Sequence, residues 1–259
     1  MKKIASIIVI ALAILCSCQS REKKPSDFVE FEDNTFDNPL DSIINVARMD
    51  SRKEEVYGYL SSHPDFFSST KNVNYPLWRD CGKIRVYSIP LVSIYTIPYF
   101  NIVQYEGVKG VVDTLSLNNV DEHLNDMFEI KSKDGKTYYL LLTDQYVEHQ
   151  GTFLREAVYA FSLENNRLVK EELFHAKNGQ YDHIEVNCGG QRYCPLDYDA
   201  ISLIQVMDVD DTDSTPSVIF ALINENDWPT GYGLKYQWDG SCFQYVGKYK
   251  YDANGYFYY

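Results

Sequence analysis

The densest group of potential metal ligands lies in one short stretch, DVDDTD, which carries the carboxylates of Asp208, Asp210, Asp211 and Asp213. Calcium takes oxygen ligands crowded into short loops, so this stretch predicts a calcium site between two strands. The alternative is a solvated turn, because Asp favours turns through hydrogen bonds to nearby backbone groups.

This acidic stretch resembles the calcium loops of integrin-type propeller repeats. It departs from their D-x-D-G-D-G pattern, because Thr212 takes the place of the third carboxylate and Ser214 stands where glycine is expected. In addition, no acid closes the loop near Ser217. The resemblance implies calcium as the cofactor, and no other cofactor is expected.

Aromatic residues form the second candidate site. Trp228, Trp238 and Tyr232 are expected to line a ligand groove in which ring faces stack on sugars. Further aromatic and polar residues of this groove would be Trp78, Tyr236, Tyr245, Asn224, Asn226 and Asp227. Packing in a β core is the default interpretation, because aromatic residues are favoured on strands and in cores.

Recognisable catalytic patterns are missing from the chain. No G-x-S-x-G, H-E-x-x-H or Walker sequence occurs. The five histidines are dispersed and have no metal-ligand spacing. Glycosidase carboxylates leave no local motif, so a glycan-acting hydrolase with carboxylates from separate strands remains the alternative to a binding protein.

Charge and composition exclude several classes of protein. The chain of 259 residues has 37 acidic and 24 basic residues and a net charge of -13, which argues against a nucleic-acid partner. Its hydrophobic fraction of 45% is too high for a disordered chain. Its mean hydropathy of -0.34 excludes a polytopic membrane protein.

The amino terminus predicts export and lipidation. Lys2 and Lys3 precede an apolar run that ends in Leu-Cys-Ser-Cys, and this order resembles the lipobox of bacterial lipoproteins. Residues 1–17 are therefore the expected signal peptide, and Cys18 is the expected acylated residue. Cleavage of this signal peptide would remove two lysines and no acids, which changes the net charge from -13 to -15. The segment after Cys18 is basic, which favours a periplasm-facing lipoprotein of the outer membrane.

Four cysteines remain after this processing, and an even number in an oxidising compartment favours disulfides. Cys188 and Cys194 bracket a short glycine-containing loop that can bring their Cα atoms within bridging range. Cys81 and Cys242 are the remaining pair, and their alternative is two free buried thiols.

The chain divides into a polar tether over residues 18–36, a helical segment over 37–66 and an all-β domain over 67–259. Leu40, Ile43, Ile44 and Ala47 have helical spacing. The sequence from residue 51 to 54 has the form of a capping box, and a stop is expected at residues 63–64.

Strand patterns dominate from about residue 80 onward. A first block predicts three strands over 84–89, 99–105 and 110–117. A second predicts four over 127–131, 137–143, 157–163 and 168–174, with hairpin turns at Asp134-Gly135 and Asn165-Asn166. A third predicts four over 201–209, 217–223, 233–238 and 242–249, with a turn at Asp239-Gly240.

These blocks predict a mainly β fold of antiparallel four-stranded meander repeats with a helical segment near the amino terminus. Repeated four-stranded units are typical of propeller blades, but three blocks fall below the usual number of blades. An irregular sandwich of ordinary meanders is the equal alternative.

Several of these segments, including KIRVYS, YFNIVQY, DGKTYYL and AFSLENNRL, are similar to motifs of uncharacterised lipoproteins of anaerobic Gram-negative gut bacteria. The similarity covers residues 80–250 and departs at residues 90–98, which lack the glycines often found there. It implies location and fold, and no activity.

Together these features favour a lipid-anchored binding or interaction module over an enzyme. Its expected partners are the membrane, through the anchor, and a glycan or envelope protein.

Overall fold

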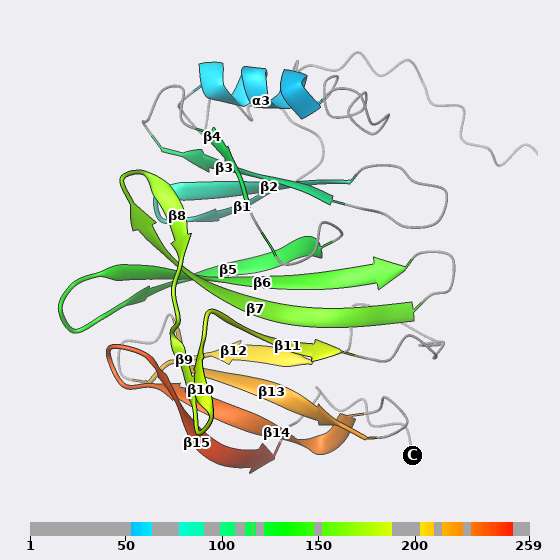
Figure 1. Cartoon of the computed structure of the whole chain (residues 1–259), viewed down its shortest axis with the longest axis vertical. Helices are drawn as coiled ribbons and strands as arrows, with labels where there is room; N and C mark the ends of the chain where they lie inside the picture. Colours follow the sequence, from blue (N-terminus) through cyan, green and yellow to red (C-terminus); the bar gives the residue numbers. More distant parts are fainter. Residues whose placement is uncertain are drawn as a thin grey trace, which may run out of the picture. The chain divides into compact units, whose positions relative to one another are not determined.

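A computed structural model describes residues 53–63, 78–90, 99–106, 112–115, 117, 122–147, 152–187, 203–209, 214–224 and 229–250. Over these residues the fold is mainly β, as predicted, with the helix α3 and fifteen strands in three sheets, none of which closes on itself (Figure 1). In this part of the chain, no helix has the length and apolar character needed to cross a bilayer. The signal peptide, Cys18 and the tether lie outside the described residues.

Sheet A is an antiparallel meander with the strand order β1-β2-β3-β4. Its strands are β1 (Trp78–Cys81), β2 (Ile84–Pro90), β3 (Tyr99–Tyr105) and β4 (Val112–Thr114). The helix α3 (Lys53–Ser62) packs on this sheet, because Val56 and Leu60 are fully buried in one cluster with Tyr87, Ile89 and Ile102. The predicted helix before the stop at residues 63–64 is thus confirmed and ends at Ser62, whereas the helical spacing at residues 40–47 lies outside the described residues.

Sheet B has the order β11-β7-β6-β5, and β8 also pairs with β7. Its strands are β5 (Glu122–Lys131), β6 (Thr137–Val147), β7 (Thr152–Glu164), β8 (Arg167–Lys170) and β11 (His183–Asn187). Both predicted hairpin turns are present. Asn165 and Asn166 have φ angles of 50° and 59°, the left-handed pair that a two-residue type I′ turn requires.

Sheet C has the order β10-β9-β15-β14-β13-β12. Its strands are β9 (Phe174–Ala176), β10 (Gly179–Tyr181), β12 (Ile204–Met207), β13 (Ser217–Ile223), β14 (Pro229–Trp238) and β15 (Phe243–Lys250). The strands β12 to β15 form the predicted third meander. The pairing of β15 with β9 is parallel, and it joins the β9–β10 hairpin to that meander.

The expected four-stranded antiparallel meanders are present as β1–β4, β5–β8 and β12–β15, with some differences in their bounds. The first block has an additional strand, β1, and the second block ends at Lys170 instead of continuing to Phe174. After β8 the chain leaves sheet B and enters sheet C, and Phe243 donates a backbone hydrogen bond of 2.7 Å to Leu173. Two of the sheets contain strands besides the meanders, β11 in sheet B and the β9–β10 hairpin in sheet C.

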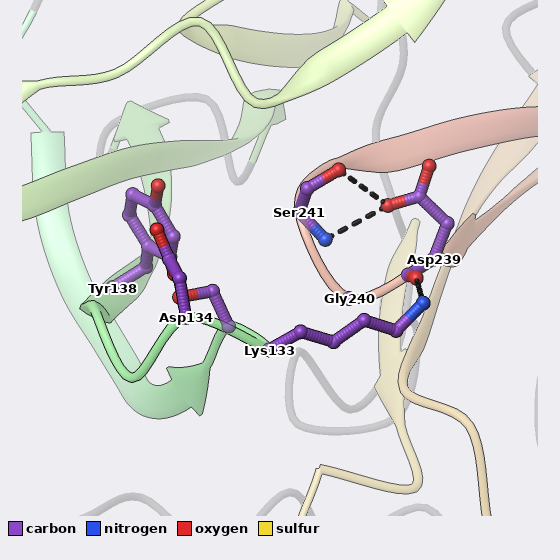
Figure 2. Close-up of a pocket in the computed structure, with 7 residues that line it drawn as sticks. Lys133, Asp134, Tyr138, Asp239, Gly240 and Ser241 are labelled. Carbon is purple, nitrogen blue, oxygen red and sulfur yellow. Dashed lines mark hydrogen bonds between the residues drawn. The ribbon is translucent and has the colours of Figure 1, made fainter.

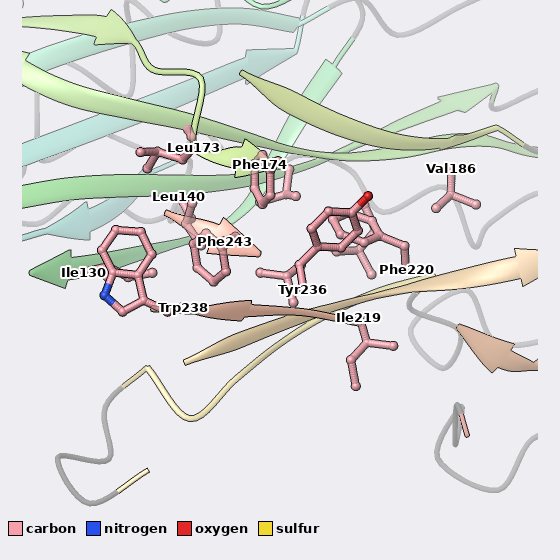
Figure 3. Close-up of a cluster of buried hydrophobic side chains, with 14 of the residues drawn as sticks. Ile130, Leu140, Leu173, Phe174, Val186, Ile219, Phe220, Tyr236, Trp238 and Phe243 are labelled. Atoms are coloured by element: carbon pink, nitrogen blue, oxygen red, sulfur yellow. The ribbon is translucent and has the colours of Figure 1, made fainter. Parts of the chain in front are cut away.

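Sheet B is buried on both faces, because the side chains of a strand alternate between the two sides. Tyr139 and Leu141 of β6 pack in a cluster with Ile84 and Val86 of sheet A. The intervening Leu140 packs with sheet C in a second cluster around Phe174, Phe220, Tyr236 and Phe243 (Figure 3). Sheet B is therefore the shared wall between two hydrophobic cores.

Cys81 and Cys242 are not joined by a disulfide, so the predicted Cys81–Cys242 bridge is not formed. Their positions explain why. Burial raises the pKa of both Tyr138 and Tyr139, and a nearby cysteine raises each pKa further. This cysteine is Cys81 for Tyr139 and Cys242 for Tyr138. Consecutive residues of β6 point to opposite faces of sheet B, so the sheet separates the two thiols. Cys188 and Cys194 lie outside the described residues.

Candidate functional site

The turns of two distant hairpins meet and form an open pocket, called here the hairpin-tip pocket (Figure 2). The β5–β6 turn contacts the β14–β15 turn through the backbone N–H of Lys133, which donates a hydrogen bond of 2.8 Å to the carbonyl of Gly240. The Lys133 ammonium also donates to the carbonyl of Asp239. The pocket has a volume of about 490 Å³ and is lined by Ser132, Lys133, Asp134, Tyr138, Asp239, Gly240 and Ser241.

The carboxylate of Asp239 organises one wall of this pocket. Its Oδ1 accepts hydrogen bonds from the backbone N–H of Ser241 at 2.8 Å and of Cys242 at 3.0 Å, and from the Ser241 hydroxyl at 2.8 Å. Its Oδ2 accepts one from the Gln244 amide at 3.2 Å. These donors, the Cys242 N–H above all, hold the pKa of Asp239 well below its usual value.

The carboxylate of Asp134 has the same role in the opposite turn. It accepts hydrogen bonds from the Ser132 hydroxyl and, at 3.4 Å, from the backbone N–H of Lys136. The Ser132 hydroxyl is the main cause of a lowered Asp134 pKa. Both carboxylates of the hairpin-tip pocket are therefore ionised at neutral pH, and neither holds a proton that it could donate to a ligand.

A cysteine and a histidine lie close together beside the pocket, but in the wrong state for nucleophilic catalysis. Cys242 Sγ is 3.4 Å from His175 Nδ1 and 3.5 Å from Asp239 Oδ2. Burial, together with the Asp239 charge, raises the pKa of the Cys242 thiol. A catalytic cysteine needs a lowered pKa, whereas here the Asp239 carboxylate contacts the thiol itself and opposes its ionisation.

A second polar group, the Glu122 cluster, lies inside sheet B. Glu122 is 1% exposed and forms a salt bridge of 3.1 Å with Arg155, which is 7% exposed. Its two oxygens also accept hydrogen bonds of 2.9 Å from Thr143 and 2.8 Å from Tyr159. Arg155 makes another salt bridge, of 2.5 Å, with Glu185. These groups bind one another, so removal of one would leave the others buried without their partner.

The predicted calcium ligands are only partly described. Asp208 is exposed, with a φ of 61°, at the end of β12. Asp210, Asp211 and Asp213 lie outside the described residues. Within the described ranges no group of three His, Cys, Asp or Glu residues is arranged to hold a metal ion.

The predicted aromatic groove does not include Trp238. That side chain is 7% exposed and packs in the core between Tyr138, at a ring-centroid distance of 5.9 Å, and Phe243, at 5.1 Å. Tyr232 is 48% exposed, and Trp228 lies outside the described residues. Core packing thus explains Trp238, and of the two described residues Tyr232 alone is accessible to a ligand.

Both turns of the hairpin-tip pocket were predicted as hairpin turns, but the pocket between them was not predicted. The pairs Asp134-Gly135 and Asp239-Gly240 predict the local backbone geometry of the two turns. The contact between the two turns joins residues more than a hundred positions apart, and a local sequence pattern cannot predict such a contact.

Comparison with known proteins gives no relative: no family model, no curated protein and no solved structure matches this chain. Over the described residues, the fold and pocket define a mainly β protein with three open sheets and a polar pocket where two hairpins meet.

Two glycines, one in each of the two turns, allow a matched test of this geometry. Gly135 and Gly240 have φ angles of 85° and 99°, but an added Cβ meets nothing within 4 Å at Gly135 and lies 2.3 Å from Lys133 at Gly240. We expect Gly135→Ala to lower the free energy of unfolding by about 1 kcal/mol, from backbone strain alone. Gly240→Ala should lower it by about 2–3 kcal/mol, since it also displaces Lys133. Urea denaturation measures both, and equal losses would contradict the close contact between the turns.

The ionisation of Asp239 predicts an acid-sensitive contribution to stability. Its folded-state pKa lies below the unfolded value of about 3.9, so the contribution is present above that pH and is lost as pH falls through the folded pKa. Because Asp239 is exposed, we expect Asp239→Asn to cost only about 1 kcal/mol at neutral pH. The difference between wild type and variant, measured by urea denaturation from pH 7 downward, should shrink below about pH 4. A constant difference would exclude a role for the charge.

Proposed function

We propose that this chain is a lipid-anchored, periplasm-facing binding module of the outer membrane, and that the hairpin-tip pocket takes a hydroxyl-rich ligand such as a glycan. The lipobox-like sequence before Cys18 and the similarity to uncharacterised lipoproteins support the location. The observation that carries the binding role is the ionised state of both pocket carboxylates, Asp134 and Asp239.

Glycoside hydrolysis normally needs one carboxylic acid whose pKa is raised, so that it can protonate the leaving oxygen. In the hairpin-tip pocket the pKa values of Asp134 and Asp239 are both shifted downward. Two carboxylates of this kind accept hydrogen bonds from ligand hydroxyl groups but provide no general acid. The pocket therefore favours binding over the alternative of a glycan-acting hydrolase.

The pocket offers hydrogen-bonding groups from both turns to such a ligand. Asp134 is exposed, and the Ser241 hydroxyl lies on the facing turn (Figure 2). Tyr138 lies between these groups and the core, with the Lys136 ammonium 5.1 Å from its ring centre. A sugar whose hydroxyls donate to the carboxylates would span the two turns, and its affinity would depend on Asp134.

A binding and hydrolysis assay on the full chain tests this proposal. Affinity electrophoresis through gels that contain dextran, polygalacturonate or soluble peptidoglycan fragments should show retardation in at least one glycan, without release of reducing ends. Asp134→Asn should lower the affinity read from the retardation about tenfold, because one hydrogen bond to a charged group is lost. The matched control is Asp126→Asn, which changes an exposed carboxylate of strand β5 outside the pocket and should have no effect.

Two outcomes would overturn it. Release of reducing ends that disappears in Asp134→Asn would make the protein a hydrolase. Absence of retardation with every glycan, or equal retardation by the Asp134 and Asp126 variants, would exclude the hairpin-tip pocket as the glycan site.

Because the proposed compartment is oxidising, we expect a disulfide between Cys188 and Cys194. Under denaturing, non-reducing conditions the processed and acylated protein should titrate with two free thiols, those of Cys81 and Cys242. Four free thiols would exclude the Cys188–Cys194 bridge.

A further inference from the structure

One end of the β14–β15 ribbon differs in charge from the rest of this acidic chain. The two strands and their turn, residues 229–250, contain three lysines and a single acid, Asp239, which lies at the opposite end of the ribbon. The lysines are Lys235, Lys248 and Lys250. Together with Tyr232, Val246 and Tyr249 they form what is called here the basic ribbon surface.

The basic ribbon surface is also unusually apolar for an exposed surface. Tyr232, Val246 and Tyr249 are 48%, 54% and 45% exposed, and they are the three most exposed large hydrophobic side chains of the described residues. Lysines stand beside both tyrosines. The Lys248 ammonium is 4.3 Å from the ring centre of Tyr232, and the Lys235 ammonium is 4.9 Å from that of Tyr249.

The two lysine–tyrosine pairs lie on opposite faces of the ribbon. Tyr249 is paired in register with Gly233 and so shares a face with Lys235, whereas Lys248 is paired with Leu234 and shares the other face with Tyr232. Lysine and tyrosine are thus presented on both sides of this end of the ribbon.

These ammonium groups are available to an external anion. Some other lysines of the described part of the chain do bind carboxylates: Lys136 binds Glu171 at 2.5 Å and Lys170 binds Asp182 at 3.7 Å. Within the described residues, no salt bridge joins Lys235, Lys248 or Lys250 to an acid of the protein.

Protection of an edge strand accounts for only part of this arrangement. Lysines commonly prevent edge-to-edge association, and β15 pairs with β9 only at Phe243 and Gln244, which leaves one edge of residues 245–250 unpaired among the described strands. Lys235, however, lies on β14, which is paired on both sides with β13 and β15. Prevention of edge-to-edge association therefore does not require a lysine at position 235.

We propose that the basic ribbon surface docks on the anionic lipid headgroups of the membrane in which the chain is anchored. Tyrosine rings and lysines with long aliphatic stems are the side chains that settle at the boundary between headgroups and water. A glycan partner fits less well, because a lysine covers one face of each tyrosine ring, the face that would stack on a sugar. This inference rests on the proposed membrane anchor, which places the bilayer within reach of the domain.

Hydrogen exchange of the full chain on vesicles tests the proposal. Vesicles of phosphatidylcholine alone are compared with vesicles that also contain phosphatidylglycerol. We expect the amides of residues 245–250 to exchange more slowly on the anionic vesicles only, and the slowing to disappear at high salt. Association with neutral vesicles reports the amino-terminal anchor separately, so failure of the anchor and failure of the docking surface are distinguishable.

Matched triple variants isolate the lysines. The variant K235Q/K248Q/K250Q should lower the docking constant, read from the ratio of the exchange rates, about 100-fold, because each lysine near an anionic surface contributes roughly a factor of five. The control K53Q/K83Q/K177Q changes the net charge equally and should dock as wild type does. Equal exchange on both kinds of vesicle, or docking retained by the ribbon variant, would overturn the proposal. Equal slowing by soluble polygalacturonate would show a glycan surface instead.

Discussion

Replacing Arg155 with methionine is expected to lower the free energy of unfolding by about 3–5 kcal/mol, one of the two largest effects of a single substitution in this protein. The change leaves the Glu122 carboxylate, which is 1% exposed, without its salt-bridge partner inside sheet B. Thr143 and Tyr159 still donate hydrogen bonds to that carboxylate, but they do not neutralise its charge. Urea denaturation, with circular dichroism as the probe, measures the loss.

Two further variants show whether an unpaired buried charge is the cause. The double variant R155M/E122Q removes both charges and should be more stable than Arg155→Met alone, so that the two effects are not additive. Lys131→Met breaks an exposed ion pair with Glu129 and should cost less than about 1 kcal/mol. A similar small cost for Arg155→Met, or a double variant less stable than the single one, would contradict the structural role of the Glu122 cluster.

Phe174→Ala is expected to lower the free energy of unfolding by about 3–5 kcal/mol. Phe174 is fully buried, and its ring centre lies 5.4 Å from that of Phe243, 6.2 Å from that of Phe220 and 6.3 Å from that of Tyr236 (Figure 3). Truncation leaves a cavity among three rings that are held by different strands of sheet C and cannot all move into it. Thermal and urea denaturation should agree on the loss.

The matched control is Tyr249→Ala, which removes a ring that is 45% exposed. It should cost less than about 1 kcal/mol, because little apolar area is lost from contact with the rest of the protein. If Phe174→Ala were no more destabilising than this control, the core between sheets B and C would be packed differently from the structure.

The sequence predicts the local parts of this fold well. Alternating apolar residues identified the long strands, and Asp134-Gly135, Asn165-Asn166 and Asp239-Gly240 identified three hairpin turns, because both signals arise within a few residues of chain. Short strands such as β10 (Gly179–Tyr181) were missed, since all three of its residues are exposed and it has no apolar face to reveal it.

Sheet membership and the site depend on contacts that the sequence does not display. The change of sheet after Lys170 follows from the burial of Phe174 among rings of sheet C, which is a property of the folded core. Glu122 and Arg155 look like ordinary polar residues of solvated strands until sheet B brings them together. The hairpin-tip pocket likewise combines two correctly predicted turns through a contact between distant parts of the chain.

The parallel pairing of β9 with β15 sets an order of assembly. Phe174 and Phe243 lie side by side in sheet C, although the β9–β10 hairpin is synthesised long before the last described strand. Closing so long a loop is slow, because chain entropy is lost before the contact is gained. The β9–β10 hairpin is therefore expected to find its place only after the carboxy-terminal meander has formed. A chain that crosses a membrane unfolded, with its amino terminus first, would complete this sheet only when nearly all of it has emerged.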